Sequence, residues 1–170
     1  MSPATIFNLH LVLGYVAWLL CFGMVWPKLR AMDRVEAHRL IATLHSFRFF
    51  GLVFILPGVT GRALPPDFAS FAAYGDFATG LLAMAALATI RIRPLFWLSV
   101  LAFNLVGAAD LLVNYYHGVR LDLPSVAGEL GAAYAIVMIY VPILMITHLA
   151  AFALLLRPAG KGAGQRRPVD

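Results

Sequence analysis

The amino-acid sequence predicts an all-α fold, a five-helix transmembrane bundle with the N-terminus outside and the C-terminus in the cytoplasm. Hydrophobic residues make up 62% of the 170 residues and the mean hydropathy is +0.85, whereas soluble domains are about 45 to 50% apolar. Five apolar segments each approach or exceed the roughly 20 residues that cross a bilayer. The segments between them are short, so we predict one domain over residues 1–157. Its helices are placed at about 5–26, 36–60, 68–90, 94–117 and 130–156.

The first apolar segment is predicted to remain as a helix rather than to be removed as a secretory signal. No Lys or Arg lies between Met1 and Leu9, and no small-residue cleavage site follows Cys21. Because Cys21 is the single cysteine, an internal disulfide is excluded. The segment ends at Trp26 and Pro27, where the tryptophan suits a membrane interface.

The other four segments carry signals for where helices begin, bend and end. The second follows a polar, helix-compatible stretch at 34–39. Pro66 and Pro94 open the third and fourth, since proline suits the first turn of a helix. Pro142 lies inside the fifth and predicts a kink, because it leaves one backbone carbonyl without its hydrogen bond. Residues 158–170 lack core-forming side chains and are predicted to be a disordered cytoplasmic tail.

The orientation follows from Lys and Arg in the connecting segments, which concentrate on the cytoplasmic side. With five crossings, ten of these residues lie on one side and only Arg62 and Arg120 on the other. The ten are Lys28, Arg30, Arg34, Arg39, Arg91, Arg93, Arg157, Lys161, Arg166 and Arg167. If Arg48 prevented the second segment from crossing, the charges would divide almost evenly. The bias therefore favours five crossings.

Three charged residues, Arg48, Asp76 and Asp110, lie within predicted transmembrane helices and are the main candidates for a functional site. A charge near the middle of a helix costs about 2.5 to 3.5 kcal/mol on insertion scales. Three of them require partners or water inside the bundle. Small residues surround Asp76 at helical spacing, so its face of the helix is predicted to pack against another helix.

The predicted depths of these three residues in the membrane place their charged groups at similar levels. At about 1.5 Å per residue from the outer side, Arg48 lies about 15 Å deep, Asp76 about 12 Å and Asp110 about 9 Å. We predict an ion pair of Arg48 with Asp76 or with Asp110. The remaining hydrogen bonds of this pair are assigned to Asn104, Asn114 and His10. The cluster either binds a ligand or serves only to fix the register of the helices.

A pair of histidines supports an alternative site. His45 and His148 fall at equal predicted depth, about 20 Å from the outer side, on two different helices. Equal depth on two helices is what bis-histidine ligation of haem b requires. A hydrogen-bonded core histidine is the more common explanation of such a pattern. No cofactor is predicted, with haem b as the alternative, and no metal site is predicted.

The segments Tyr74–Asp76, Asn104–Asp110 and Val141–His148 resemble a family of small bacterial multi-pass integral membrane proteins of uncharacterised function. The pattern is Tyr-Gly-Asp, then Asn-x-x-Gly-x-x-Asp, then Val-Pro-x-x-x-x-Thr-His. The resemblance implies a location in the bacterial inner membrane. It draws attention to Asp76, Asn104, Asp110 and His148, but it implies no activity, substrate or cofactor.

Several functions remain compatible with the sequence. The polar cluster could bind or pass a small molecule, a proton or a lipid headgroup, with a homo-oligomer needed if it transports. The alternatives are a haem or quinone redox protein using His45 and His148, a structural or assembly subunit, and an enzyme that acts on a lipid. A non-enzymatic function is favoured, because no carboxylate pair shares a helix face at a catalytic spacing. The lipid bilayer is the expected partner, and a nucleic-acid partner is not expected.

Overall fold

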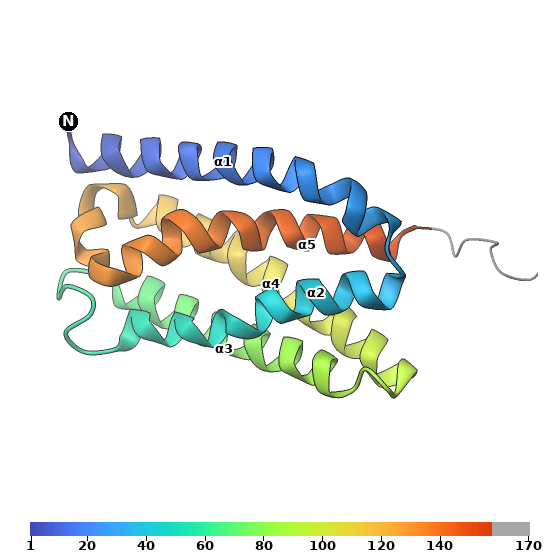
Figure 1. Ribbon diagram of the computed structural model, residues 1–170. Coiled ribbons are helices and arrows are strands. Elements are labelled where there is room, and N and C mark those ends of the chain that lie inside the picture. The colour runs from blue at the N-terminus through green and yellow to red at the C-terminus, as the bar shows by residue number, and fades with distance from the viewer. Residues whose placement is uncertain (158–170) are drawn as a thin grey trace, which may run out of the picture.

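The computed structural model describes residues 1–157, which form helices joined by short connections and contain no β-strand. The α-helices are α1 (Pro3–Ala31), α2 (Arg34–Ser46), α3 (Pro66–Ala88), α4 (Arg93–Arg120) and α5 (Val141–Leu155). Two 3₁₀ segments, η1 (Phe47–Ile55) and η2 (Leu123–Ala133), and one π-helical segment, η3 (Ile136–Tyr140), complete the chain. The long helices lie side by side in a bundle (Figure 1). The predicted tail, 158–170, lies outside the described residues.

Four helical stretches are long and apolar enough to cross a membrane. They are Pro3–Ala31, Pro66–Ala88, Arg93–Arg120 and Ile136–Leu155. The prediction of five such helices is therefore not confirmed, because the second one is divided. Residues predicted as one helix over 36–60 instead form the 13-residue α2 followed by the nine-residue η1.

The 3₁₀ geometry of η1 explains why the sequence pattern predicts one continuous helix over 36–60 and not two segments. Side chains three residues apart eclipse one another in a 3₁₀ helix. Arg48, Gly51 and Phe54 have this spacing, and all three are buried. Gly80 of α3 lies so close to η1 that an added Cβ would come within 3.0 Å of the backbone nitrogen of Phe49. The three-residue period thus turns Arg48 and its neighbours toward α3.

The last predicted helix, 130–156, also differs from the structure. The chain passes through η2, whose Gly131 has a left-handed φ of +53° that suits glycine, and then through the π-helix η3. Pro142 lies in the first turn of α5, directly after η3. The irregularity predicted for this proline is therefore present as a π-helix, a common cause of bends in long helices.

Two apolar clusters occupy opposite ends of the bundle, with polar residues between them. One joins the first residues of α1 and α3 to η2, and includes Phe7, Phe68 and Leu130. The other joins α2 to the beginning of α4 and the end of α5, and includes Phe96 and Leu154. The buried polar residues of the middle layer are His45, Arg48, Asp76, Thr79, Asn104, Asp110, Thr147 and His148. This layer holds the predicted site.

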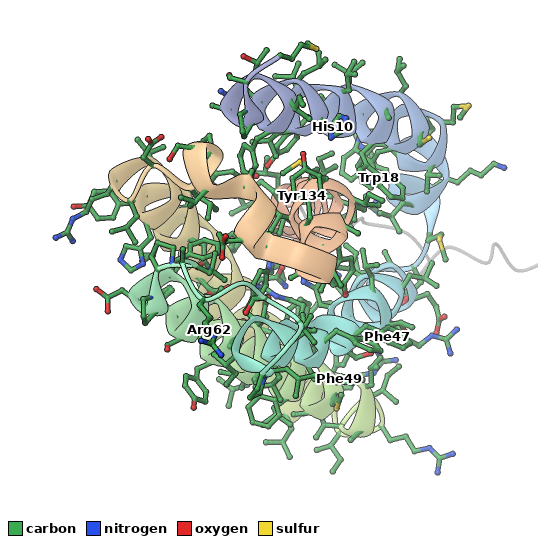
Figure 2. The ribbon with its side chains drawn as sticks, turned by 90° about the vertical axis from the view of Figure 1, so that its left-hand side faces the viewer. His10, Trp18, Phe47, Phe49, Arg62 and Tyr134 are labelled. Atoms are coloured by element: carbon green, nitrogen blue, oxygen red, sulfur yellow. The ribbon has the colours of Figure 1, made fainter. Side chains whose placement is uncertain are left out.

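Helix α1 lies at the edge of the bundle (Figure 1). Only Phe7 and Leu29 of its 29 residues are buried. It packs against α5, η2 and η3. Viewed from the end of the bundle, His10 and Tyr134 point toward one another across this contact (Figure 2). The aromatic residues of η1 that the same view labels, Phe47 and Phe49, lie on the side away from α1.

Candidate functional site

Arg48 is the centre of the buried polar layer. Its side chain is fully buried. The Nε atom donates a hydrogen bond of 2.6 Å to Asp76 Oδ1, and Nη2 donates one of 2.5 Å to Asp110 Oδ2. Both contacts are ion pairs. The sequence predicted one of these two pairs, and the structure contains both, because Arg48 of η1 projects between α3 and α4.

The third side of the guanidinium contacts α4 and α5. Nη1 lies 3.3 Å from the carbonyl oxygen of Gly107 and 3.1 Å from Nε2 of His148. Because a guanidinium only donates, His148 Nε2 must accept, and its proton lies on Nδ1. Nδ1 then donates to Asn104 Oδ1 over 2.9 Å. The predicted role of Asn104 is thus indirect, since it orients the histidine that contacts Arg48.

Glycines allow the charged side chains to enter the interior. A Cβ added at Gly107 would lie 2.6 Å from Arg48 Nη1 and 2.5 Å from His148 Nε2. A Cβ at Gly75 would collide with the carboxylate of Asp110, and one at Gly51 with that of Asp76. These positions were not predicted as part of the site. Gly75 and Gly107 lie one and three residues before a buried aspartate, and Gly51 lies three residues after Arg48.

The two carboxylates have different surroundings. Both oxygens of Asp110 accept hydrogen bonds, Oδ2 from Arg48 and Oδ1 from Asn114 Nδ2 at 3.1 Å. Asp76 Oδ1 accepts from Arg48, whereas its Oδ2 has no donor among residues 1–157. If both carboxyl groups are ionised, one guanidinium leaves one negative charge in excess. An uncompensated charge in an apolar interior is costly, so the site favours a further proton or cation.

A cavity of about 140 Å³ adjoins Asp76. Its walls come from α1, η1, α3, α4, η2, η3 and the first residue of α5, and they are mostly apolar. Asp76 and Asn114 bring polar groups of the cluster to this cavity. Asn114 Oδ1 is buried without a hydrogen-bond partner in the part of the chain that the structure describes. The cavity therefore combines apolar walls with two polar residues of the cluster, Asp76 and Asn114.

His10 is not part of the cluster. The sequence assigned it to the Arg48 ion pair because of its depth. In the structure it is exposed, and Nδ1 lies 2.9 Å from the hydroxyl oxygen of Tyr134. Depth along a helix does not determine which side of the helix faces the interior. The prediction for His10 is therefore wrong, whereas Asn114 does hydrogen-bond to Asp110.

His45 and His148 lie side by side but do not fit haem ligation. Their ring centroids are 4.1 Å apart with a tilt of 47°, which leaves no space for a porphyrin between them. His45 Nε2 is bonded to Thr147 Oγ1 at 2.9 Å, and His148 Nε2 accepts from Arg48. The hydroxyl of Thr147 donates in turn to Ile143 O. Both histidines therefore belong to the hydrogen-bonded core.

Glu129 has a structural contact that the sequence did not predict. Its carboxylate accepts from the backbone N–H of Ala63 at 3.0 Å, and its carbonyl accepts from Gly61 N at 2.7 Å. These bonds join the 56–65 connection to η2.

Comparison with known proteins identifies the family. The model of a family described as Domain of unknown function (DUF8737) matches residues 6–156, and the chain belongs to this family. No match was found among curated proteins or among solved structures. The family assignment agrees with the resemblance to an uncharacterised family, while the motif and the bacterial origin remain predictions.

Proposed function

We propose that the chain is an integral protein of the bacterial inner membrane that crosses the bilayer five times, with the N-terminus outside. The fifth crossing is the combined α2 and η1. At about 1.5 Å per α-helical residue and 2.0 Å per 3₁₀ residue, these 13 and nine residues extend about 37 Å. This length exceeds the roughly 30 Å of hydrocarbon. The exposed Phe47 and Phe50 suit contact with lipid.

Within this topology, the protein binds a small amphiphilic molecule in the cavity beside Asp76. The observation that carries the proposal is an apolar cavity in which Asp76 Oδ2 and Asn114 Oδ1 have no partner among the described residues. An engineered cavity of about 150 Å³ holds benzene, so this one suits a ring or a short chain. A hydroxyl group of the ligand would give Asp76 Oδ2 a hydrogen-bond partner, which no described residue supplies.

The same geometry favours binding over proton conduction. A relay from the cavity to the opposite end of the bundle would pass through Arg48, which contacts both aspartates and His148. An arginine keeps its proton under physiological conditions. The guanidinium therefore interrupts such a relay, while its positive charge holds the two carboxylates in place.

Binding of benzyl alcohol to the protein in lipid nanodiscs tests the proposed function. The decisive variant is Leu11→Trp, because Leu11 of α1 lines the cavity and an indole would fill it. Leu13→Trp is the matched control, since Leu13 lies on the same helix with 53% of its surface exposed. We expect Leu11→Trp to weaken binding at least about tenfold, which corresponds to about 1.4 kcal/mol.

The control variant should bind as the wild type does. Equal affinity in the two tryptophan variants would place the ligand elsewhere. No binding to the wild type would favour the structural alternative, in which the cluster only fixes helix register.

A further inference from the structure

We infer that the ligand of this cavity is an organic cation, a small apolar ammonium that exchanges with a proton held by Asp76. The inference rests on the proposed binding function and specifies its chemistry. It starts from the charges of the cluster, which contains two carboxylates and one guanidinium. Each carboxylate lies within hydrogen-bond distance of the guanidinium.

Charge balance requires one more positive charge than Arg48 supplies. Arg48 is fully buried, and Asp76 and Asp110 are 6% and 4% exposed, so water compensates little of the excess. The neutral form of His148 contributes no charge, because its Nε2 accepts from Arg48. In the empty site, one carboxyl group therefore retains a proton, and in the occupied site a cation can replace it.

Hydrogen bonding assigns that proton to Asp76. Both oxygens of Asp110 accept hydrogen bonds, which stabilise its charged form. Asp76 has one such bond, and its Oδ2 has no donor among the described residues. Asp76 is also the aspartate that lines the cavity. The exchangeable proton is thus on the carboxyl group that a ligand can reach.

Charged and titratable groups from four elements surround Asp76. The charged and titratable side chains nearest to Asp76 are Arg48 of η1, Asp110 and Tyr115 of α4, Tyr140 of η3 and His148 of α5. Tyr115 is bonded to Tyr15 of α1, and Tyr140 donates to the carbonyl of Leu44. The residues that line the cavity include no Lys or Arg. An entering ammonium therefore meets no positive charge ahead of Arg48.

The exchange balances in atoms and charge. A protonated Asp76 and an ammonium in solution give an Asp76 carboxylate paired with the bound ammonium, and one proton passes to the solvent. The ammonium N–H groups donate to Asp76 Oδ2 and Asn114 Oδ1, and the apolar part of the ligand contacts the walls. No covalent bond other than the O–H bond of the carboxyl group breaks.

The experiment compares benzylamine with benzyl alcohol by isothermal titration calorimetry on the full chain in nanodiscs. At pH values well below its own pKa, benzylamine stays an ammonium, so any pH dependence belongs to the protein. We expect one proton to be released for each benzylammonium bound, measured from the heats in buffers of different ionisation enthalpy. Its affinity should rise about tenfold per pH unit while Asp76 is protonated, whereas the affinity for benzyl alcohol should stay constant.

The outcomes separate this inference from the proposed function. Binding of benzyl alcohol without binding of benzylammonium, or without proton release, overturns the cation inference and leaves the proposed function in place. Failure of both probes to bind overturns both. Asp76→Asn should reduce benzylammonium affinity at least about tenfold and abolish the release of a proton on binding. If this variant does not fold, the number of protons that the wild type releases for each benzylammonium bound still tests the inference.

Discussion

Helix α1 and the rest of the bundle are held in place by different forces. The 29 residues of α1 bury only Phe7 and Leu29, and side-chain hydrogen bonds connect it to the other helices. In contrast, the guanidinium of Arg48 in η1 is fully buried among the other elements. It contacts α3 through Asp76, α4 through Asp110 and α5 through His148. The buried charged groups therefore hold η1, α3, α4 and α5 in position relative to one another, whereas α1 forms one wall of the cavity.

Two side-chain hydrogen bonds of α1, those of His10 and Trp18, are directed at irregular parts of the chain, whereas Tyr15 bonds to Tyr115 of α4. Trp18 Nε1 donates to the carbonyl of Ile139 at 2.7 Å, within the π-helix η3. A Cβ added at Gly14 would approach the carbonyl oxygen of Met138 to 2.5 Å, so α1 packs directly on this backbone. A π-helix and a proline leave carbonyls without regular partners. Helix α1 therefore covers the part of the chain where the backbone is least regular.

The largest expected effect is that of Arg48→Met, which tests the interior. Removing the guanidinium leaves the buried Asp110 carboxylate without its counter-ion and Asp76 without its hydrogen-bond donor. Breaking a buried ion pair in this way costs about 3 to 5 kcal/mol. We expect a strong loss of folded protein, measured by denaturant unfolding in detergent micelles.

Arg62→Met is the control for this change, because Arg62 is an exposed arginine of a connecting segment. It should unfold as the wild type does. The triple variant with Arg48→Met, Asp76→Asn and Asp110→Asn should recover part of the lost stability, since it removes the charges along with their partner. Wild-type stability in Arg48→Met alone would disprove the central role of the cluster.

A smaller loss is expected from Gly107→Ala. The added methyl group would overlap Arg48 and His148 and also Thr79 Cγ2 at 2.6 Å. Overpacking of this kind costs about 1 to 3 kcal/mol. Gly23→Ala on α1 is the matched control, because no atom lies within 4 Å of its added Cβ. Thermal unfolding should show a lower midpoint for Gly107→Ala and an unchanged or higher one for Gly23→Ala.

The two aspartates should differ when each is changed to asparagine. Asp110→Asn loses charge-assisted bonds at both oxygens and should cost about 2 kcal/mol. Asp76→Asn resembles the protonated acid of the empty site and should cost less than about 1 kcal/mol. Unfolding curves of the two variants measure the difference. Equal losses would mean that the two carboxylates share the excess charge evenly.

The smallest effect concerns the attachment of α1. Trp18→Phe removes the hydrogen bond to Ile139 and should cost about 1 kcal/mol. Trp26→Phe is the control on the same helix, since Trp26 makes no side-chain hydrogen bond within residues 1–157. Hydrogen exchange should increase in α1 and remain unchanged around Arg48. Increased exchange at the cluster would show that α1 also stabilises the interior.

The sequence predicted the parts of this structure that depend on polarity and length. Arg48, Asp76 and Asp110 are conspicuous because charges are rare in apolar helices. In the structure Arg48 forms ion pairs with both aspartates. The prediction for His10 failed because depth carries no information on which side of a helix faces inward. The division of the second helix was missed because the burial of Arg48 and Gly51 follows a three-residue period, and a 3.6-residue period had been assumed.

Other features could not be predicted from one sequence. The cavity results from the way α1, α4 and η2 pack, and no local pattern contains that information. The hydrogen bond between Asn104 and His148 joins α4 to α5 through residues that are 44 positions apart in the chain. Gly75 and Gly107 could have been recognised as close-packing positions, because small residues next to buried polar ones permit helices to approach.

The central claim is that the cluster holds one positive charge in addition to Arg48, as a proton on Asp76 when the cavity is empty. Infrared difference spectroscopy tests it directly, because the carbonyl stretch of a protonated carboxyl group is distinct from the carboxylate bands. We predict one such signal at neutral pH, absent in Asp76→Asn and replaced by a carboxylate signal when benzylammonium is added. A wild-type spectrum without this signal, or a signal that persists in Asp76→Asn, would contradict the account.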